Sequence, residues 1–133
     1  NMYSKDMLVG IFLGTAKTEI YLEKNEHSQI GYRVRLRVNL RANEDFLVGV
    51  QRSLAQLQIT SRYKESEHKG RQRPILRVGG IKNLYKLWGF IPPNLPDANN
   101  DWYKFREAVS IVSNGGHLQL EGLERLFELK GLI

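Results

Sequence analysis

Residues 32–41 form the segment YRVRLRVNLR. Its side chains alternate without a break between an apolar or aromatic set and a polar set, and the polar set is Arg33, Arg35, Arg37, Asn39 and Arg41. Because successive side chains of an extended chain point to opposite faces, the alternation predicts a β-strand with one apolar face and one basic face. Four arginines on one face repel one another, so the pattern raises the question of what that face meets.

Elsewhere in the chain, three more segments have a strand pattern and five have apolar residues at helical spacing. The strands are expected at about 18–22, 58–65 and 72–78, and polar turns at 24–31 and 66–71. The helices are expected at 4–14, 43–57, 81–90, 101–112 and 118–130. This order predicts an α+β fold for residues 1–133, a single domain with one antiparallel four-stranded sheet packed on helices.

The composition is that of an ordinary folded protein with a surplus of positive charge. Of 133 residues, 41% are hydrophobic, and 20 Lys and Arg against 14 Asp and Glu give a net charge of +6. That surplus favours polyanionic partners such as nucleic acid. Cysteine is absent and the three histidines lack ligand spacing, so we expect no metal site of that kind. No apolar run approaches the ~20 residues that span a bilayer, and we assign the apolar N-terminal stretch to the fold rather than to a signal peptide.

The polar faces of the four strands should form one continuous surface, called here the basic sheet face. Its expected members are Glu19, Tyr21, Arg33, Arg35, Arg37, Asn39, Arg41, Arg62, Lys64, Arg73 and Arg77. An antiparallel sheet can leave such a face to solvent, which is the plainer interpretation. A solvated face usually mixes both signs of charge, however, whereas concentrated arginine suits phosphate, which guanidinium binds bidentately. Arginine and asparagine also match guanine and adenine edges in a major groove, so we expect this face to bind nucleic acid.

Three short stretches resemble one known family. LVGIFLGTA at residues 8–16 is similar to its glycine-containing motif helix, Gly31-Tyr32 precedes the basic strand as in that family, and HLQLEGLERLFELK at residues 117–130 is similar to its closing stretch. Together with the strand order, they make the chain resemble the LAGLIDADG homing endonucleases in their single-motif form. The resemblance covers nearly the whole chain and implies an αββαββα half.

The resemblance also implies how such a half works. The motif helix would pack against its counterpart from a second half, through Leu8, Gly10, Ile11 and Gly14. Two sheets would then lie side by side as a saddle over the major groove, with the basic sheet face on the DNA. The expected partners are therefore nucleic acid and either a second copy of the chain, as a homodimer, or another half of the same kind.

The chain departs from the family pattern at the catalytic positions. Active members have an acidic residue near the end of the motif, and two halves together hold divalent metal there; this position is Thr15, preceded by Leu13 and followed by Ala16. A polar residue expected after the second strand falls near Ala42, and the loop at 96–100 has no Lys or Arg where the family has a basic residue. A neutral hydroxyl does not replace a carboxylate as a ligand for Mg²⁺, so we expect no catalytic residue, no metal site and no cleavage.

Several functions stay open at this stage. The sequence favours a non-cleaving protein that binds duplex DNA over structured RNA, and the alternative is an RNA-binding maturase or a component of an organelle ribonucleoprotein. A metal-dependent endonuclease would need an acid from the partner half, or Glu19 and Glu23 in its place, and only then Mg²⁺ as cofactor. A structural protein with no nucleic-acid role is the third class. We expect no membrane partner, and an intracellular, organellar or mobile-intron setting is compatible with the sequence.

Overall fold

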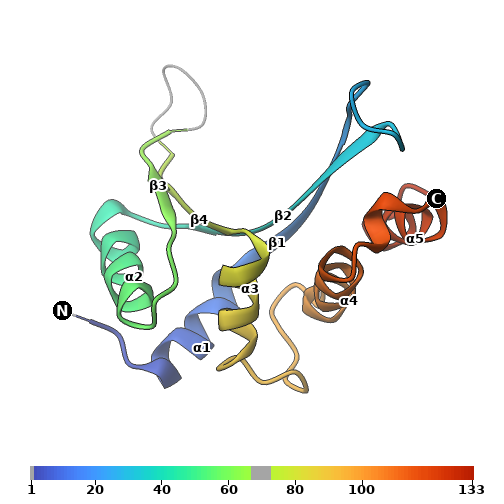
Figure 1. Cartoon of the computed structure of the whole chain (residues 1–133). Coiled ribbons are helices and arrows are strands. Elements are labelled where there is room, and N and C mark those ends of the chain that lie inside the picture. The colour runs from blue at the N-terminus through green and yellow to red at the C-terminus, as the bar shows by residue number, and fades with distance from the viewer. Residues whose placement is uncertain (1, 67–72) are drawn as a thin grey trace.

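The computed structural model describes residues 2–66 and 73–133, and in this part of the chain five α-helices lie on one side of a curved four-stranded sheet (Figure 1). The elements are α1 (Lys5–Thr15), β1 (Lys17–Lys24), β2 (Tyr32–Arg41), α2 (Glu44–Gln56), β3 (Arg62–Lys64), β4 (Ile75–Gly79), α3 (Ile81–Trp88), α4 (Trp102–Ser113), the 3₁₀ turn η1 (Gly116–Leu118) and α5 (Leu120–Lys130). The hairpins β1–β2 and β3–β4 rise away from the helices at both ends of the sheet (Figure 1). The face turned away from the helices is therefore concave and open.

The sheet has the order β1-β2-β4-β3 and every neighbouring pair is antiparallel. The predicted α+β class with one antiparallel four-stranded sheet is confirmed, and β2 spans the predicted residues 32–41. The prediction for the third strand was too long. It begins at Arg62 rather than near 58, because Gln58 has a φ of 61° and the backbone N–H of Thr60 donates to the Asn83 side chain instead of to a strand.

Two sequence predictions fall partly outside the described residues. The polar turn expected at 66–71 is described only at Ser66, and the strand expected to begin at 72 is described from 73 onward. Within the described part, β4 begins at Ile75. The backbone N–H of Arg73 donates to the Glu65 carbonyl at 3.0 Å, which joins the two segments beyond the paired strands.

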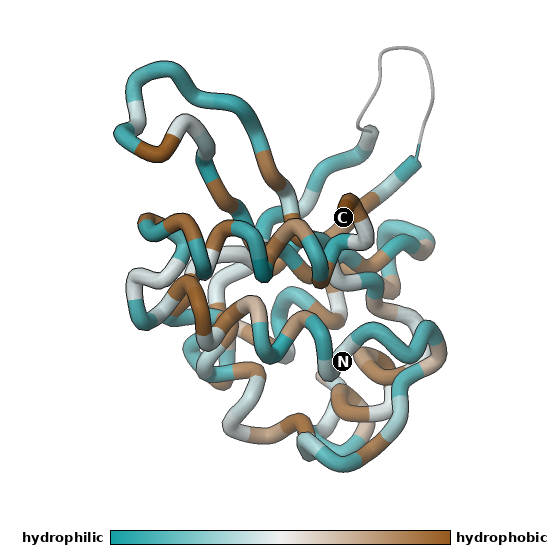
Figure 2. Tube along the Cα trace, turned by 90° about the vertical axis from the view of Figure 1, so that its right-hand side faces the viewer, coloured by the Kyte–Doolittle hydropathy of each residue, from teal (hydrophilic) through white to brown (hydrophobic). Residues whose placement is uncertain are grey.

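The core lies between the inner sheet face and the helices. Val38, Leu40, Leu76 and Val78 point inward from the two central strands and are at most 1% exposed. Polar and apolar residues alternate along the strands of the long hairpin (Figure 2), which is the pattern that buries one face of a sheet and leaves the other wet. The helices supply the other side of the core with fully buried residues such as Phe12 of α1.

Aromatic residues of α3 and α4 pack together at the core. Trp88, Trp102 and Phe105 form a cluster with ring centroids 5.0 to 6.1 Å apart. Arg106 covers this cluster, with its guanidinium carbon 4.5 Å from the Trp88 ring and one nitrogen donating to the Ile91 carbonyl at 2.6 Å. This contact fixes α4 against the end of α3. In the described part of the chain, none of the helices has both the length and the apolar character needed to cross a bilayer.

The approach of α5 to the η1 turn depends on Gly122. A Cβ atom at this position would clash with the carbonyl oxygen of Gly116. That oxygen belongs to the backbone, so no side-chain rotation can relieve the clash. Gly122→Ala is therefore expected to lower the free energy of unfolding by about 2–3 kcal/mol through overpacking. Urea denaturation measures this loss. Glu124→Ala is the matched control, because Glu124 is exposed on the same helix; equal stability of the two variants would contradict the assignment.

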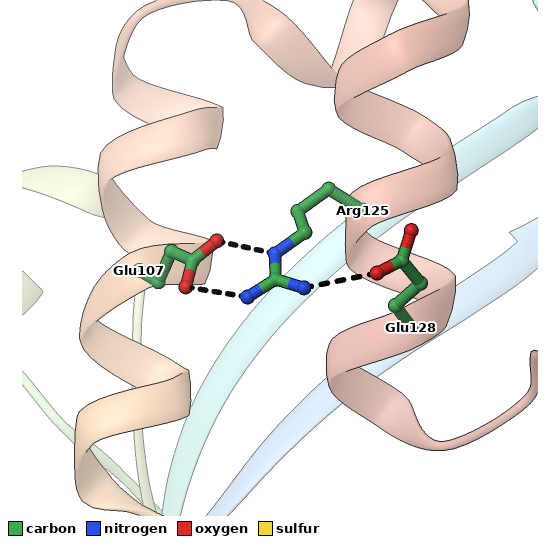
Figure 3. A network of polar contacts seen from close by, with 3 residues as sticks. All are labelled: Glu107, Arg125 and Glu128. Carbon is green, nitrogen blue, oxygen red and sulfur yellow. Dashed lines mark hydrogen bonds and ion pairs between the residues drawn. The ribbon is translucent and has the colours of Figure 1, made fainter.

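A charged network joins the last two helices (Figure 3). Arg125 of α5 donates to both carboxylate oxygens of Glu107 on α4, at 2.5 and 3.0 Å, and to Glu128 one turn further along α5, at 2.9 Å. These hydrogen bonds lower the pKa of Glu107 below its ordinary value of 4.5 and raise that of Arg125. The bidentate fork positions α5 against α4, although the charges are largely exposed and salt screens them.

The lowered pKa of Glu107 gives stability a pH dependence of definite sign. Because the folded state favours the carboxylate, the stabilisation is present above the pKa of the unfolded chain and is lost as the pH falls through the folded pKa. Glu107→Gln should therefore be less stable than the wild type near neutral pH, and the gap should close as the pH falls below the ordinary carboxyl pKa of 4.5 and through the lower pKa of the folded state. Urea denaturation across this range measures the gap, and a gap independent of pH would refute the role given to this carboxylate.

Candidate nucleic-acid interface

The strand register brings the predicted basic residues onto one face of the sheet. Arg35 lies opposite Tyr21, Arg37 opposite Glu19, and Arg77 between Asn39 on one side and Arg62 on the other. By the same register and the alternation of side chains, the basic sheet face also contains Arg33, Arg41 and Lys64. Arg73 lies two residues before β4 and is exposed.

One residue of the basic sheet face is apolar and buried. Ile75 occupies a position on the basic sheet face between Arg41 and Lys64, yet it is 1% exposed. It does not belong to the core cluster between sheet and helices. An isoleucine sheltered among long basic side chains is consistent with their methylene stems lying along the sheet and their charged ends reaching outward.

Glu19, Arg37 and Tyr21 form a compact charged cluster on the face. Arg37 lies 3.5 Å from the Glu19 carboxylate, and its guanidinium carbon is 4.7 Å from the centre of the Tyr21 ring. Arg37 is held on two sides and its side chain is only 17% exposed. Glu19 is thus engaged with a cation of its own sheet, which argues against its use as a replacement metal ligand.

Asn39 and Arg77 form a second coupled pair at the centre of the sheet. The Nε–H of Arg77 donates to Oδ1 of Asn39 at 2.9 Å across the β2–β4 boundary. This bond fixes which end of the Asn39 amide is the oxygen, so that its NH₂ group is left as a donor.

A groove of ≈ 810 Å³ opens where β4 ends and β2 continues. Its walls include the basic side chains Arg35, Arg37, Arg62, Lys64 and Arg77, and the backbone at Gly79 and Gly80 forms one end. Basic groups from three strands therefore converge on one concavity. The rest of the lining is neutral and includes the apolar residues Val34, Leu36, Ile81, Leu84 and Val112, so the basic groups form only part of its wall.

Two basic residues at this face were missed from the sequence. β1 begins at Lys17, one residue earlier than predicted, and the register places Lys17 opposite Asn39. Lys130 comes from the end of α5: its Nζ donates to the Ile20 carbonyl at 2.6 Å and lies 5.8 Å from the Tyr21 ring. If the predicted strand had begun at residue 17 instead of 18, it would have included Lys17. No local signal points to Lys130, because the contact joins residues 110 positions apart.

The motif helix α1 has one buried side and one open side. Leu8 and Phe12 are buried in the core of this chain, so Leu8 does not lie on the open strip where it was predicted. Gly10 and Gly14 are exposed and a Cβ on either meets nothing within 4 Å, while Ile11 is half-buried. Met7, which the sequence prediction omitted, is 52% exposed and lies one turn before them. The open strip of α1 therefore consists of Met7, Gly10 and Gly14, with Ile11 at its border.

The end of α1 is closed by hydrogen bonds and carries no acid. The Thr15 hydroxyl donates to the Ile11 carbonyl at 2.5 Å. The loop before α4 closes two more carbonyls: Ala98 donates its N–H to Leu13 at 2.7 Å, and the Asn99 side chain donates to Ala16 at 3.2 Å. In residues 2–66 and 73–133, no group of three or more His, Cys, Asp or Glu side chains is placed to hold a metal ion.

The two other positions expected to differ from the family also have structural roles. Ala42 is half-buried and packs against the core. In the loop at 96–100, Asp97 accepts hydrogen bonds from the backbone N–H groups of Asp101 and Trp102, and so caps the start of α4. Neither position offers a base, an acid or a cation to the basic sheet face.

Comparison with known proteins finds a relative whose name describes an endonuclease. No protein-family model matches the chain. A curated protein of Neurospora crassa named "Probable intron-encoded endonuclease 3" is 27% identical over 128 residues, which cover 91% of this chain and 23% of that protein. The chain therefore spans under a quarter of the length of this relative.

Three solved structures have a fold similar to that of this chain. The homing endonuclease I-TnaI is 22% identical with a TM-score of 0.81, over 97% of this chain and 86% of that one. The LAGLIDADG meganuclease I-CpaMI, bound to uncleaved DNA, is 19% identical with a TM-score of 0.79, over 96% of this chain and 44% of that one. The LAGLIDADG homing endonuclease I-SmaMI, bound to cleaved DNA, is 18% identical with a TM-score of 0.82, over 98% and 43%. The resemblance inferred from the sequence is thus confirmed, and the chain has the fold of one half of a LAGLIDADG homing endonuclease.

Proposed function

We propose that this chain binds duplex DNA through the basic sheet face, as one of two paired halves, and does not cleave it. The observation that carries the proposal is the strand register, which gathers basic side chains from all four strands on the open concave face. They are Lys17, Arg33, Arg35, Arg37, Arg41, Arg62, Lys64 and Arg77. Two solved structures with the same fold are described as bound to DNA.

The charge arrangement supports a polyanion more strongly than bulk solvent. Arg35, Arg62 and Lys64 are exposed on this face. Each of these cations that neutralises a phosphate would release a condensed counterion from the DNA, which favours binding. Arginine adds bidentate geometry to this non-specific attraction.

The absence of cleavage follows from the available ligands. Hydrolysis of a phosphodiester with Mg²⁺ needs hard anionic oxygen ligands close to the scissile phosphate. At the end of α1 the candidate oxygen is the neutral hydroxyl of Thr15, which carries no charge to bind Mg²⁺ as a carboxylate would. The carboxylate on the same face, Glu19, lies against Arg37. Among residues 2–66 and 73–133, no group of three or more His, Cys, Asp or Glu side chains offers a ligand set for the metal chemistry.

Pairing follows from the open strip of α1. Met7, Gly10 and Gly14 leave one side of this helix exposed, and two glycines allow another helix to approach closely. The chain matches 86% of one homing-endonuclease chain but 43 and 44% of two others, so halves of this size occur both alone and two to a chain among structures of this fold. A second copy and a separate second half are both compatible with this geometry.

A binding selection tests the proposal. The purified chain is mixed with random duplex DNA and structured RNA at near-physiological salt in the presence of Mg²⁺, and the retained molecules are sequenced and sized. Enrichment of a duplex motif of roughly 20 base pairs, about two helical turns, with the strands intact, is the expected result. Enrichment of RNA would move the function to a ribonucleoprotein, and cut DNA would overturn the loss of cleavage.

A further inference from the structure

The strand β2 has an open edge along its first half. β4 pairs only with residues 37–41 of β2, because β4 ends at Gly79 and the chain then turns into α3. β1 continues beside β2 to the first residue of that strand, so the β1–β2 hairpin projects past the end of β4 (Figure 1). Within residues 2–66 and 73–133, no strand pairs with the side of residues 32–36 that faces away from β1. We call this side the open edge.

Val34 directs its backbone hydrogen-bonding groups to the open edge. The carbonyl of Ile20 accepts from the Lys130 Nζ of α5 at 2.6 Å, so it points away from β2. Ile20 and Leu36 therefore lie opposite each other without exchanging hydrogen bonds, and Leu36 directs its own groups away from β1. In agreement, the Leu36 carbonyl oxygen lies 3.7 Å from where a Cβ on Gly79 would stand. Val34 has the same orientation, because it lies two residues before Leu36 on the same strand.

The groove at the end of β4 lies along the open edge, since part of β2 lines it, and its two walls differ in chemistry. Val34, Ile81 of α3 and Val112 of α4 contribute half-buried apolar side chains to one wall. Arg35 and Arg62 contribute exposed cations to the other. A strand added at this edge therefore places every second side chain among apolar groups and the side chains between them beside arginine.

We infer that the open edge binds an extended peptide segment of a partner protein as an added strand, in which acidic side chains alternate with apolar ones. The peptide backbone pairs with Val34, the apolar side chains enter the groove, and the acids lie beside Arg33 and Arg35, which are both exposed. The same arginines disfavour β2 of a second copy as the occupant, because pairing would gather the arginines of both copies on one face. This binding does not rest on the proposed binding of DNA.

A labelled peptide with the core Val-Glu-Val-Glu-Val tests the chemistry of the site. Its glutamates match the positions of Arg33 and Arg35, and its central valine matches that of Val34. The measurement is fluorescence anisotropy with the purified chain and no nucleic acid. This peptide should bind about tenfold more tightly than the same peptide with lysine in place of glutamate, because the lysines exchange two opposite-charge pairs across strands for two like-charge pairs.

Methylation of the central valine nitrogen of the peptide tests strand addition. The methyl group removes the N–H that donates to the Val34 carbonyl and leaves both glutamates in place, so binding should be lost. The matched control carries the methyl group on the nitrogen of the second glutamate. That nitrogen points away from β2 in the added strand, so the control should bind as the unmethylated peptide does.

Reversal of one charge on the protein tests where the peptide lies. Arg35→Glu should lose the preference for the glutamate peptide and bind the lysine peptide about fivefold more tightly than wild type does. Arg52→Glu is the matched control, because it makes the same change of charge at an exposed position of α2, outside the sheet. Thermal unfolding verifies that both variants keep the fold. If Arg35→Glu does not fold, the peptide variants still decide, because they leave the protein unchanged.

Four results would each overturn the inference. They are failure of the glutamate peptide to bind, equal binding of the glutamate and lysine peptides, full binding of the peptide methylated at its central valine, and an equal effect of Arg52→Glu and Arg35→Glu. Because no nucleic acid is present in these measurements, peptide binding and DNA binding can fail separately.

Discussion

Changing Arg35 and Arg37 together to alanine is expected to lower the affinity for duplex DNA about 30-fold near physiological salt. Each arginine that neutralises a phosphate contributes a factor of about five through counterion release at this salt concentration, and the slope of log K against log salt should fall by about two. Both residues line the groove at the end of β4. Fluorescence anisotropy with a labelled duplex, measured at several salt concentrations, gives the affinity and the slope together.

The loss should exceed that of an equal change of charge elsewhere. Arg37 lies 3.5 Å from Glu19, so its removal also leaves a carboxylate facing the phosphates. The matched control changes Arg52 of α2 and Lys82 of α3 to alanine, because both are exposed and lie on helices outside the sheet. If the two double variants weaken binding equally, the charge of the whole chain and not the basic sheet face determines the affinity.

The parts of the fold that the sequence predicted are those encoded in neighbouring residues. The alternation in residues 32–41 fixed both the limits of β2 and the face on which its arginines lie. The N-cap residues Ser4 and Asn43 are local signals as well, and the side chain of each accepts a backbone N–H three residues ahead. Such signals act over one strand or one helical turn, so they can be read without knowledge of the rest of the chain.

The parts that the sequence did not predict depend on distant contacts. The late start of β3 results from a hydrogen bond between Thr60 and Asn83, 23 residues apart. Lys130 reaches the edge of β1 from the other end of the chain. The burial of Leu8 depends on which side of α1 meets the core, and α1 is apolar on nearly every side, so its pattern alone did not distinguish the core from the open strip.

At the end of the motif helix, one feature is evident in the sequence and another depends on contacts with a distant loop. The identity of Thr15 is evident in the sequence and already argues against metal binding. The structure adds that the hydroxyl donates to the Ile11 carbonyl of the same helix, and that the loop before α4 donates hydrogen bonds to two neighbouring carbonyls. Restoring an acid at this one position would therefore leave the remaining ligands, and the partner half, still to be supplied.

Gly10→Leu is expected to abolish pairing of the chain and to lower its affinity for a full two-half duplex about 100-fold, because two linked binding sites gain this order of affinity from acting together. The physical reason is distance: helices that cross at glycine can approach more closely than helices separated by a leucine side chain. Sedimentation measures the pairing, and titration with the duplex enriched by wild type measures the affinity.

Two substitutions at Gly10 distinguish an effect on pairing from an effect on folding. Since a Cβ at Gly10 meets nothing within 4 Å in this chain, Gly10→Leu should keep the monomer folded, and Gly10→Ala should stabilise α1 by about 0.5–1 kcal/mol. Affinity for a duplex holding half of the motif should not change, because one basic sheet face remains intact. Ser110→Leu, at an exposed position of α4, controls for an added apolar side chain. If Gly10→Leu binds the full duplex as wild type does, the open strip of α1 is not the pairing surface, and the basic sheet face must act without a second half.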